Sequence, residues 1–237
     1  MTRTTRTEAL TARPYQAVAP AWHTVVVILL MLGISFAGAR SGSFPGAGAH
    51  GRIAGYVLVM VVEWATAAFI WYGVRHRGFS ISELVGGSWA RPRLVLRDLA
   101  IAIVFLLIAT LVLNGLQYLL KAVQNPAIRN MFPHGPAEII VYLSLVLTAG
   151  FCEELIFRGY LQRQFAALTH AVAGGIVLQG VVFGASHGYQ GWKFMLIIAG
   201  FGMMFGLLAY WRRSLRPGMV AHFLQDGLGG LLGPYLH

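Results

Sequence analysis

The stretch AEIIVYLSLVLTAGFCEELIFRGY, residues 137–160, decides the fold of this chain. Its first part is mainly apolar, and an apolar run of about 20 residues is what a helix needs to cross the hydrocarbon core of a membrane. Two glutamates and an arginine, Glu153, Glu154 and Arg158, follow directly. The stretch therefore predicts a membrane helix with ionisable side chains at membrane depth.

The rest of the chain repeats the apolar part of this pattern. Of its 237 residues 57% are hydrophobic and only 11% are charged, whereas a soluble domain carries about 25% charged residues. We therefore predict an all-α, polytopic transmembrane helix bundle with seven to eight spans. The seven candidate segments are Trp22–Ala39, Ile53–Val74, Leu99–Leu120, Ala137–Gly150 with its continuation, Ala171–Ser186, Trp192–Trp211 and Gly218–Leu236. A division of the fourth segment near Gly150 would give the eighth span.

The basic residues predict how the chain sits in the membrane. Thirteen of the 18 Lys and Arg residues fall in segments that share one side with the N-terminus, and cytoplasmic loops are enriched in these residues. We expect residues 1–21 to form a cytoplasmic segment, residues 22–136 three membrane helices with their loops, and residues 137–237 a membrane core. The Arg, Ala and Gly bias suggests a bacterial inner-membrane protein. A basic patch on a soluble fold, which nucleic-acid binding needs, is absent.

The first group of buried charges lies at residues 153–158. Glu154 and Arg158 are four residues apart, so on one helix they can form an ion pair. Glu153 is rotated by about 100° from Glu154 and is left without this partner. A buried carboxylate of this kind can serve as a general base. The alternative is that all three charges sit at the membrane interface and simply pair.

Two further polar pairs occur on later apolar segments. His187 follows Phe183 by four residues, and Asp226 follows His222 by four residues. Each pair alone is also compatible with an interfacial or structural role. Together with Glu153 they supply a base, a polarising group and an orienting partner on three separate spans. Since polar groups left apart in lipid would be unsatisfied, we predict that they meet in one intramembrane site.

At these residues the sequence resembles the CAAX-protease and bacteriocin-processing (CPBP, or Abi) family of intramembrane endopeptidases. The resemblance covers about Ala137–Leu231, and order and spacing of the family's three motifs match. The motifs read Glu153-Glu154-x-x-x-Arg158, Phe183-x-x-x-His187 and His222-x-x-x-Asp226.

The resemblance implies that the region 137–237 is a catalytic core that hydrolyses peptide bonds. It implies that Glu153 and His187 activate a water molecule and that His222 and Asp226 stabilise the oxyanion. It leaves Glu154 and Arg158 as a structural ion pair and Phe183 as packing of the site. Other members have Asn at the last position; since an ionised Asp would repel an oxyanion, Asp226 must be protonated or act by orienting His222.

Metal dependence is open at this stage. The family has been labelled a metalloprotease family, but a metal-free glutamate mechanism is also argued for it. The chain has no His-Glu-x-x-His pair of the soluble zinc proteases. Glu153, His187 and His222 could still form a three-ligand zinc site. We favour a site without a metal cofactor and keep zinc as the alternative.

Other functions compete with proteolysis on the sequence alone. A small membrane transporter would also place charges at mid-membrane, and a non-catalytic family member could act as a scaffold. A serine site built from Ser186 and His222 would need a different motif. Glu63, in mid-span beside Trp64, is expected to make a structural hydrogen bond. The predicted partners are a peptide or membrane-protein substrate and the lipid bilayer, and the sequence leaves the oligomeric state and recognition of prenylated substrates undetermined.

Overall fold

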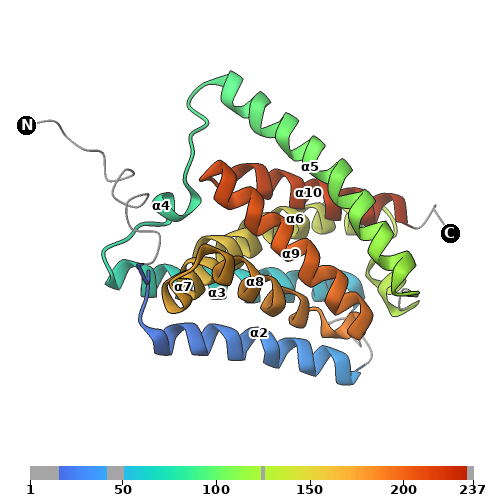
Figure 1. Cartoon of the computed structure of the whole chain (residues 1–237). Coiled ribbons are helices and arrows are strands. Elements are labelled where there is room, and N and C mark those ends of the chain that lie inside the picture. Colours follow the sequence, from blue (N-terminus) through green and yellow to red (C-terminus); the bar gives the residue numbers. More distant parts are fainter. Residues whose placement is uncertain (1–15, 42–50, 124–125, 234–237) are drawn as a thin grey trace, which may run out of the picture.

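The computed structural model describes residues 16–41, 51–123 and 126–233, and this part of the chain is helical and contains no β-strand (Figure 1). Arg3, Arg6 and Arg13, which contribute to the predicted orientation, lie outside the described residues. The helices are α2 (Ala21–Ser41), α3 (Gly51–His76), α4 (Ile81–Val85), α5 (Pro92–Leu119), α6 (Pro136–Glu153), α7 (Gln162–Thr169), α8 (Val172–Ala185), α9 (Trp192–Arg212) and α10 (Arg216–Leu232). Three tighter or wider helical turns, η1 (Pro126–Met131), η2 (Glu154–Leu161) and η3 (Gly188–Gln190), complete the set.

Within the described residues, five helical segments are long and apolar enough to cross a membrane, which confirms the predicted all-α membrane bundle. They are α2, α3, α5, α9 and the continuous segment Pro136–Thr169. The two remaining predicted spans are helices as well, but they are shorter. α8 has 14 residues and α10 has 17, below the roughly 20 residues that span a bilayer upright.

The fourth predicted segment is one helix from Pro136 to Thr169, so the alternative of a division near Gly150 is wrong. Gly150 instead allows α10 to approach α6 closely. A Cβ atom at this position would lie 3.0 Å from the carbonyl oxygen of Met219 and 3.2 Å from the backbone nitrogen of Phe223. The glycine therefore serves helix packing and does not end the helix.

The same segment departs from regular α-helix directly after Glu153. Residues Glu154–Leu161 form a π-helical stretch, η2, in which the backbone N–H of Gln162 donates to the carbonyl oxygen of Phe157, five residues earlier. π-Helical turns are rare and often occur at functional sites. We expected a regular α-helix for this motif, and this expectation is wrong for residues 154–161.

The third predicted span begins earlier than expected, at Pro92 rather than Leu99. Pro92 occupies the first position of α5, and Arg91 before it is extended. Proline is favoured there because the missing N–H has no intrahelical partner in the first turn. The preceding loop also contains α4, which Ser80 and Glu83 hold with reciprocal capping hydrogen bonds.

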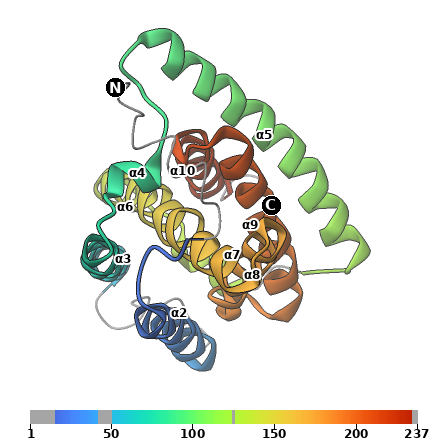
Figure 2. The same cartoon turned by 60° about the vertical axis from the view of Figure 1, so that its left-hand side comes forward.

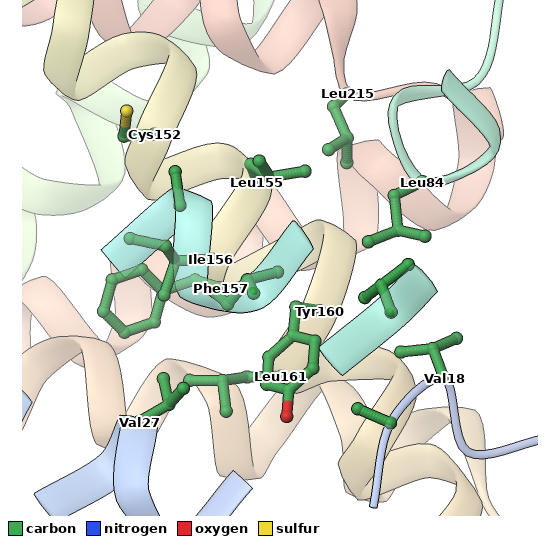
Figure 3. Packing of buried hydrophobic residues seen from close by; sticks show 14 of the residues in the cluster. Val18, Val27, Leu84, Cys152, Leu155, Ile156, Phe157, Tyr160, Leu161 and Leu215 are labelled. Carbon is green, nitrogen blue, oxygen red and sulfur yellow. The ribbon is translucent and has the colours of Figure 1, made fainter. Parts of the chain in front are cut away.

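The helix that carries the first motif lies in the middle of the bundle. Its buried side chains, among them Cys152, Leu155, Phe157 and Tyr160, form one cluster with residues of α2, α4 and the turn before α10 (Figure 3). Of the most apolar window in Pro136–Thr169, 56% is buried inside the protein, against 11% for α5. Figure 2 shows α5 along the outer edge of the bundle, where it packs on α9 and α10. Polar residues of the central helix are therefore enclosed by protein.

Glycines also set the distance between α8 and α9, and so the position of the second motif. A Cβ atom at Gly184 would collide with the carbonyl oxygen of Met195, and one at Gly180 would lie 2.9 Å from that of Ala199. Small residues let helix backbones approach in a membrane, where close packing drives association. The end of α8, with Phe183, is thereby pressed against α9.

Candidate active site

The three sequence motifs meet at His222 of α10. Its Nε2 atom lies 3.6 Å from Oε2 of Glu153 and 3.5 Å from Oδ2 of Asp226. Its Nδ1 atom lies 3.1 Å from Oε1 of Glu154, in hydrogen-bond distance. The imidazole thus bridges the end of α6, the start of η2 and its own helix, and each ring nitrogen faces a carboxylate.

Glu154 and Arg158 form the ion pair that their spacing predicts, at 2.8 Å between Oε1 and Nη1. Both side chains are fully buried. The guanidinium also donates to the carbonyl oxygen of Gly202, and it lies over the rings of Phe183 and Phe205 at 4.3 and 4.8 Å. An Arg that is hydrogen-bonded, paired and stacked in this way is well suited to a buried position.

Glu154 is therefore more than the structural partner of Arg158. Its Oε1 atom receives hydrogen bonds from Nη1 of Arg158 and faces Nδ1 of His222. A carboxylate that accepts from one imidazole nitrogen fixes the ring orientation and directs the other nitrogen. Sequence spacing could not show this contact because His222 is 68 residues further along the chain.

His187 lies just after α8 and is held through its Nδ1 atom. Nδ1 is 2.8 Å from the carbonyl oxygen of Phe183, which can only accept, so Nδ1 carries the hydrogen. In the neutral ring Nε2 is then a free acceptor. The ring of Phe183 packs edge-on against His187 at 4.8 Å and against His222 at 6.3 Å, so Phe183 separates and orients the two imidazoles.

Ser186 is not arranged as a nucleophile. Its hydroxyl donates to the carbonyl oxygen of Phe183 at 2.7 Å, and the imidazole 3.2 Å from it is that of His187. A serine nucleophile instead hydrogen-bonds to the base that will take its proton. The pairing of Ser186 with His222 weighed from the sequence is not formed.

Exposure decreases across the cluster in a regular order. The side chain of Asp226 is 39% exposed and that of Glu153 is 19% exposed, whereas His222 is 5% and Glu154 is 0% exposed. Glu153 and Asp226 therefore stand on the accessible side, where a substrate would arrive. Glu154 and Arg158 support them from the interior.

Two further residues belong to the same polar region. Tyr189, in η3, packs its ring 6.0 Å from that of His187 and interacts electrostatically with Glu153 and Asp226. Burial raises the pKa of Tyr189, so its phenol stays neutral beside these acids. Glu63 of α3 interacts with Glu153, His222 and Asp226. The mid-span charge of Glu63 was visible in the sequence, but nothing in the sequence singled out Tyr189.

The arrangement does not fit a three-ligand zinc site. Among the described residues no group of three or more His, Cys, Asp and Glu side chains lies close enough together to hold a metal ion. Nδ1 of His222 is engaged by Glu154, and its Nε2 faces Glu153 and Asp226. The candidate set Glu153, His187 and His222 therefore lacks the converging geometry that zinc requires.

Comparison with known proteins gives one match. Residues 135–228 match the model of the family described as "Type II CAAX prenyl endopeptidase Rce1-like", and the matched region contains all three motifs. No curated protein and no solved structure matches the chain significantly.

Proposed function

We propose that this protein is a CAAX-type intramembrane protease that hydrolyses peptide bonds at membrane depth with water activated by Glu153 and His187. The match of residues 135–228 to the Rce1-like family model supports the proposal. The observation that carries the proposal is the convergence of Glu153, Glu154 and Asp226 on the single imidazole of His222. The family match supports a protease, and this geometry supports the assignment of roles.

In the proposed reaction Glu153 is the general base. Its carboxylate takes one proton from water while the water oxygen forms a bond to the peptide carbonyl carbon. Glu153 then gives this proton to the amide nitrogen as the C–N bond breaks, so an acid and an amine leave. Nε2 of His187, a free acceptor, accepts a hydrogen bond from the same water.

His222 is the proposed oxyanion donor. Glu154 holds Nδ1, so Nε2 points toward the accessible side of the cluster. Because Glu154 is an acceptor, Nδ1 carries a hydrogen, so Nε2 carries one only in the imidazolium form of His222, which the facing carboxylates of Glu153 and Asp226 favour. This Nε2–H can donate to the oxygen of the tetrahedral intermediate, and one such donor is worth about 10²–10³ in rate. Asp226, at 3.5 Å from Nε2, orients this N–H and does not itself contact the oxyanion.

We propose that the site works without a metal cofactor, because both ring nitrogens of His222 face carboxylates and, among the described residues, no three ligands converge. Metal analysis of the purified protein tests this proposal. We expect no stoichiometric metal and unchanged activity in chelator. Bound zinc that is lost together with activity would overturn the metal-free mechanism.

The proposed substrates are peptides or membrane-protein tails that reach the site from the bilayer. We further propose a bacterial inner membrane as the location, with the N-terminus in the cytoplasm, because most of the basic residues between the predicted spans then lie on the cytoplasmic side. N-terminal proteomics of membranes that contain the wild type or Glu153→Gln would identify the cleaved proteins.

The direct test uses the protein in proteoliposomes with two quenched CAAX-type peptides, one prenylated and one not. We expect the wild type to cleave at least one of them and Glu153→Gln to lose about 10³-fold in rate. The matched control is Glu138→Gln, which changes a glutamate of the same helix that pairs with Arg52 at 2.7 Å. Undiminished cleavage by Glu153→Gln would refute the proposed function.

A further inference from the structure

Glu63 lies in the middle of α3 without the structural hydrogen bond that its sequence position suggested. Its Oε2 atom is buried and has no hydrogen-bond donor among the described residues. The polar contact between α3 and α6 at this level is made by Trp64, whose Nε1 donates to Oγ1 of Thr148 at 3.3 Å. The carboxyl group of Glu63 is thus not what holds the two helices together.

The surroundings of Glu63 are those of the active site. Trp64 stacks on Phe151 at 5.5 Å between ring centroids, two residues before Glu153, which sets the two helices side by side at this level. The charged groups of Glu153, His222 and Asp226 are near enough to act electrostatically on Glu63. A fourth helix therefore adds a carboxyl group to the site that none of the three motifs includes.

This part of the site has more hydrogen-bond acceptors than donors. Oε2 of Glu63 and Oε2 of Glu153 are both buried, and neither has a hydrogen-bond partner in the described part of the chain. Nε2 of His222 lies 3.6 Å from Oε2 of Glu153, beyond good hydrogen-bond distance. Two buried acceptors call for a small molecule with two donors, and water has two O–H groups.

Resting on the proposed hydrolysis, we propose that Glu63 is a further catalytic residue that binds the attacking water. Its Oε2 accepts a hydrogen bond from one O–H, which it shares with Nε2 of His187 as a three-centre hydrogen bond, while Glu153 removes the proton of the other O–H. The oxygen lone pair is then directed at the peptide carbonyl, and the hydrogen held by Glu63 stays on the oxygen that becomes part of the new carboxyl group. Orientation of this kind is a large part of the rate that an enzyme supplies.

The proposal separates activity from stability. Glu63→Leu removes the acceptor and also removes a buried polar atom that no protein group satisfies. We expect a loss of about 10²-fold in kcat with KM unchanged and a melting temperature equal to or above that of the wild type. Glu63→Gln keeps an acceptor oxygen of the same shape, so it should lose no more than about tenfold.

Thr148→Val is the matched control at the same interface. It removes the acceptor of Trp64 and should lower the melting temperature while kcat stays the same. Each variant is assayed with the quenched peptide that the wild type cleaves faster. Wild-type kcat in Glu63→Leu, or a loss of activity that comes with a lower melting temperature, would overturn the role of Glu63.

Glu153→Gln, assayed in parallel, distinguishes the two proposals. If Glu153→Gln is active, the hydrolytic mechanism itself fails. If Glu153→Gln is inactive and Glu63→Leu is as fast as the wild type, only the water-binding role of Glu63 fails. The expected pattern is an inactive Glu153→Gln, a slow but stable Glu63→Leu and a partly rescued Glu63→Gln.

Discussion

Two buried polar clusters of this molecule differ in how completely they are hydrogen-bonded. In the cluster around Gln164, which we call the N-terminal cluster, Oε1 accepts from the backbone N–H groups of Val18 and Ala19 at 2.7 and 3.2 Å. Nε2 donates to the carbonyl oxygen of Ala19 and to Thr24. In the cluster around His222, which we call the site cluster, the Oε2 atoms of Glu63, Glu153 and Glu154 have no partner among the described residues.

The difference indicates what each cluster is for. His23 extends the N-terminal cluster by bonding Tyr160 through Nδ1 and the carbonyl oxygen of Phe69 through Nε2, so it ties α2 to α3 and η2. Buried polar groups with complete hydrogen bonds stabilise a fold, whereas unpaired ones cost stability. Local departures of this kind concentrate at functional sites. The unpaired Oε2 atoms of Glu63 and Glu153 support the proposal that these two residues bind the attacking water.

The largest combined effect on folding stability and on rate is expected from Glu154→Gln. It leaves the buried guanidinium of Arg158 without its counter-charge, a change that costs about 3–5 kcal/mol. It also weakens the hold on Nδ1 of His222, so kcat should fall by about 10²-fold. Thermal unfolding and peptide cleavage measure the two effects, and full thermal stability in this variant would contradict the role of the ion pair.

Gln164→Leu should affect stability alone. It leaves two buried backbone N–H groups without an acceptor, and the combined loss should be about 3 kcal/mol in the free energy of unfolding. We expect kcat of the folded protein to be unchanged. Thr24→Val, which removes one hydroxyl of the same cluster, should cost about 1 kcal/mol. A kcat that falls with Gln164→Leu would show that the two clusters are coupled.

Gly218→Ala tests how tightly α10 must approach Glu154. A Cβ atom at this position would lie 2.9 Å from Oε2 of Glu154, so the carboxylate or the helix must shift, at a cost of about 1–3 kcal/mol. Gly227 is the control on the same helix, because a Cβ atom there meets nothing within 4 Å. Gly227→Ala should leave stability equal or improve it by up to about 1 kcal/mol. Equal effects of the two changes in thermal unfolding would refute the close contact.

Asp226→Asn should have the smallest effect. An amide can still accept from Nε2 of His222, and it adds an N–H donor without a negative charge near the oxyanion. We expect kcat to stay equal or to rise by up to about tenfold, less than the full value of one oxyanion donor. A loss of about 10²-fold in the peptide assay would show instead that the carboxylate of Asp226 takes part in proton transfer.

The sequence was sufficient for the helical membrane fold, and it singled out Glu153 and Asp226, which lie beside His222. An apolar run predicts a helix because each span must hydrogen-bond its own backbone groups in lipid. The polar residues inside the spans are few, so they can be recognised in the sequence. The i,i+4 pair of Glu154 and Arg158 could be predicted because it is local. Helix boundaries such as Pro92 were misplaced by several residues.

What the sequence did not reveal depends on contacts between distant segments. The contact of Glu154 with His222 and the position of Glu63 beside Glu153 both depend on how α3, α6 and α10 pack, and no local pattern encodes that packing. The π-helical stretch after Glu153 was missed as well, because its residues have the composition of an ordinary apolar helix. Gly150 was ambiguous for the same reason, since a glycine can end a helix or permit a close approach.

The central claim is that Glu153, whose Oε2 atom has no hydrogen-bond partner among the described residues, supplies rate and not stability. It is tested most directly by measuring peptide cleavage and melting temperature of Glu153→Gln and Gln164→Leu side by side in the same lipid. We expect Glu153→Gln to lose about 10³-fold in rate with an equal or higher melting temperature, and Gln164→Leu to melt earlier with an unchanged kcat. A Glu153→Gln protein that still cleaves, or that loses activity only because it unfolds, would contradict the account.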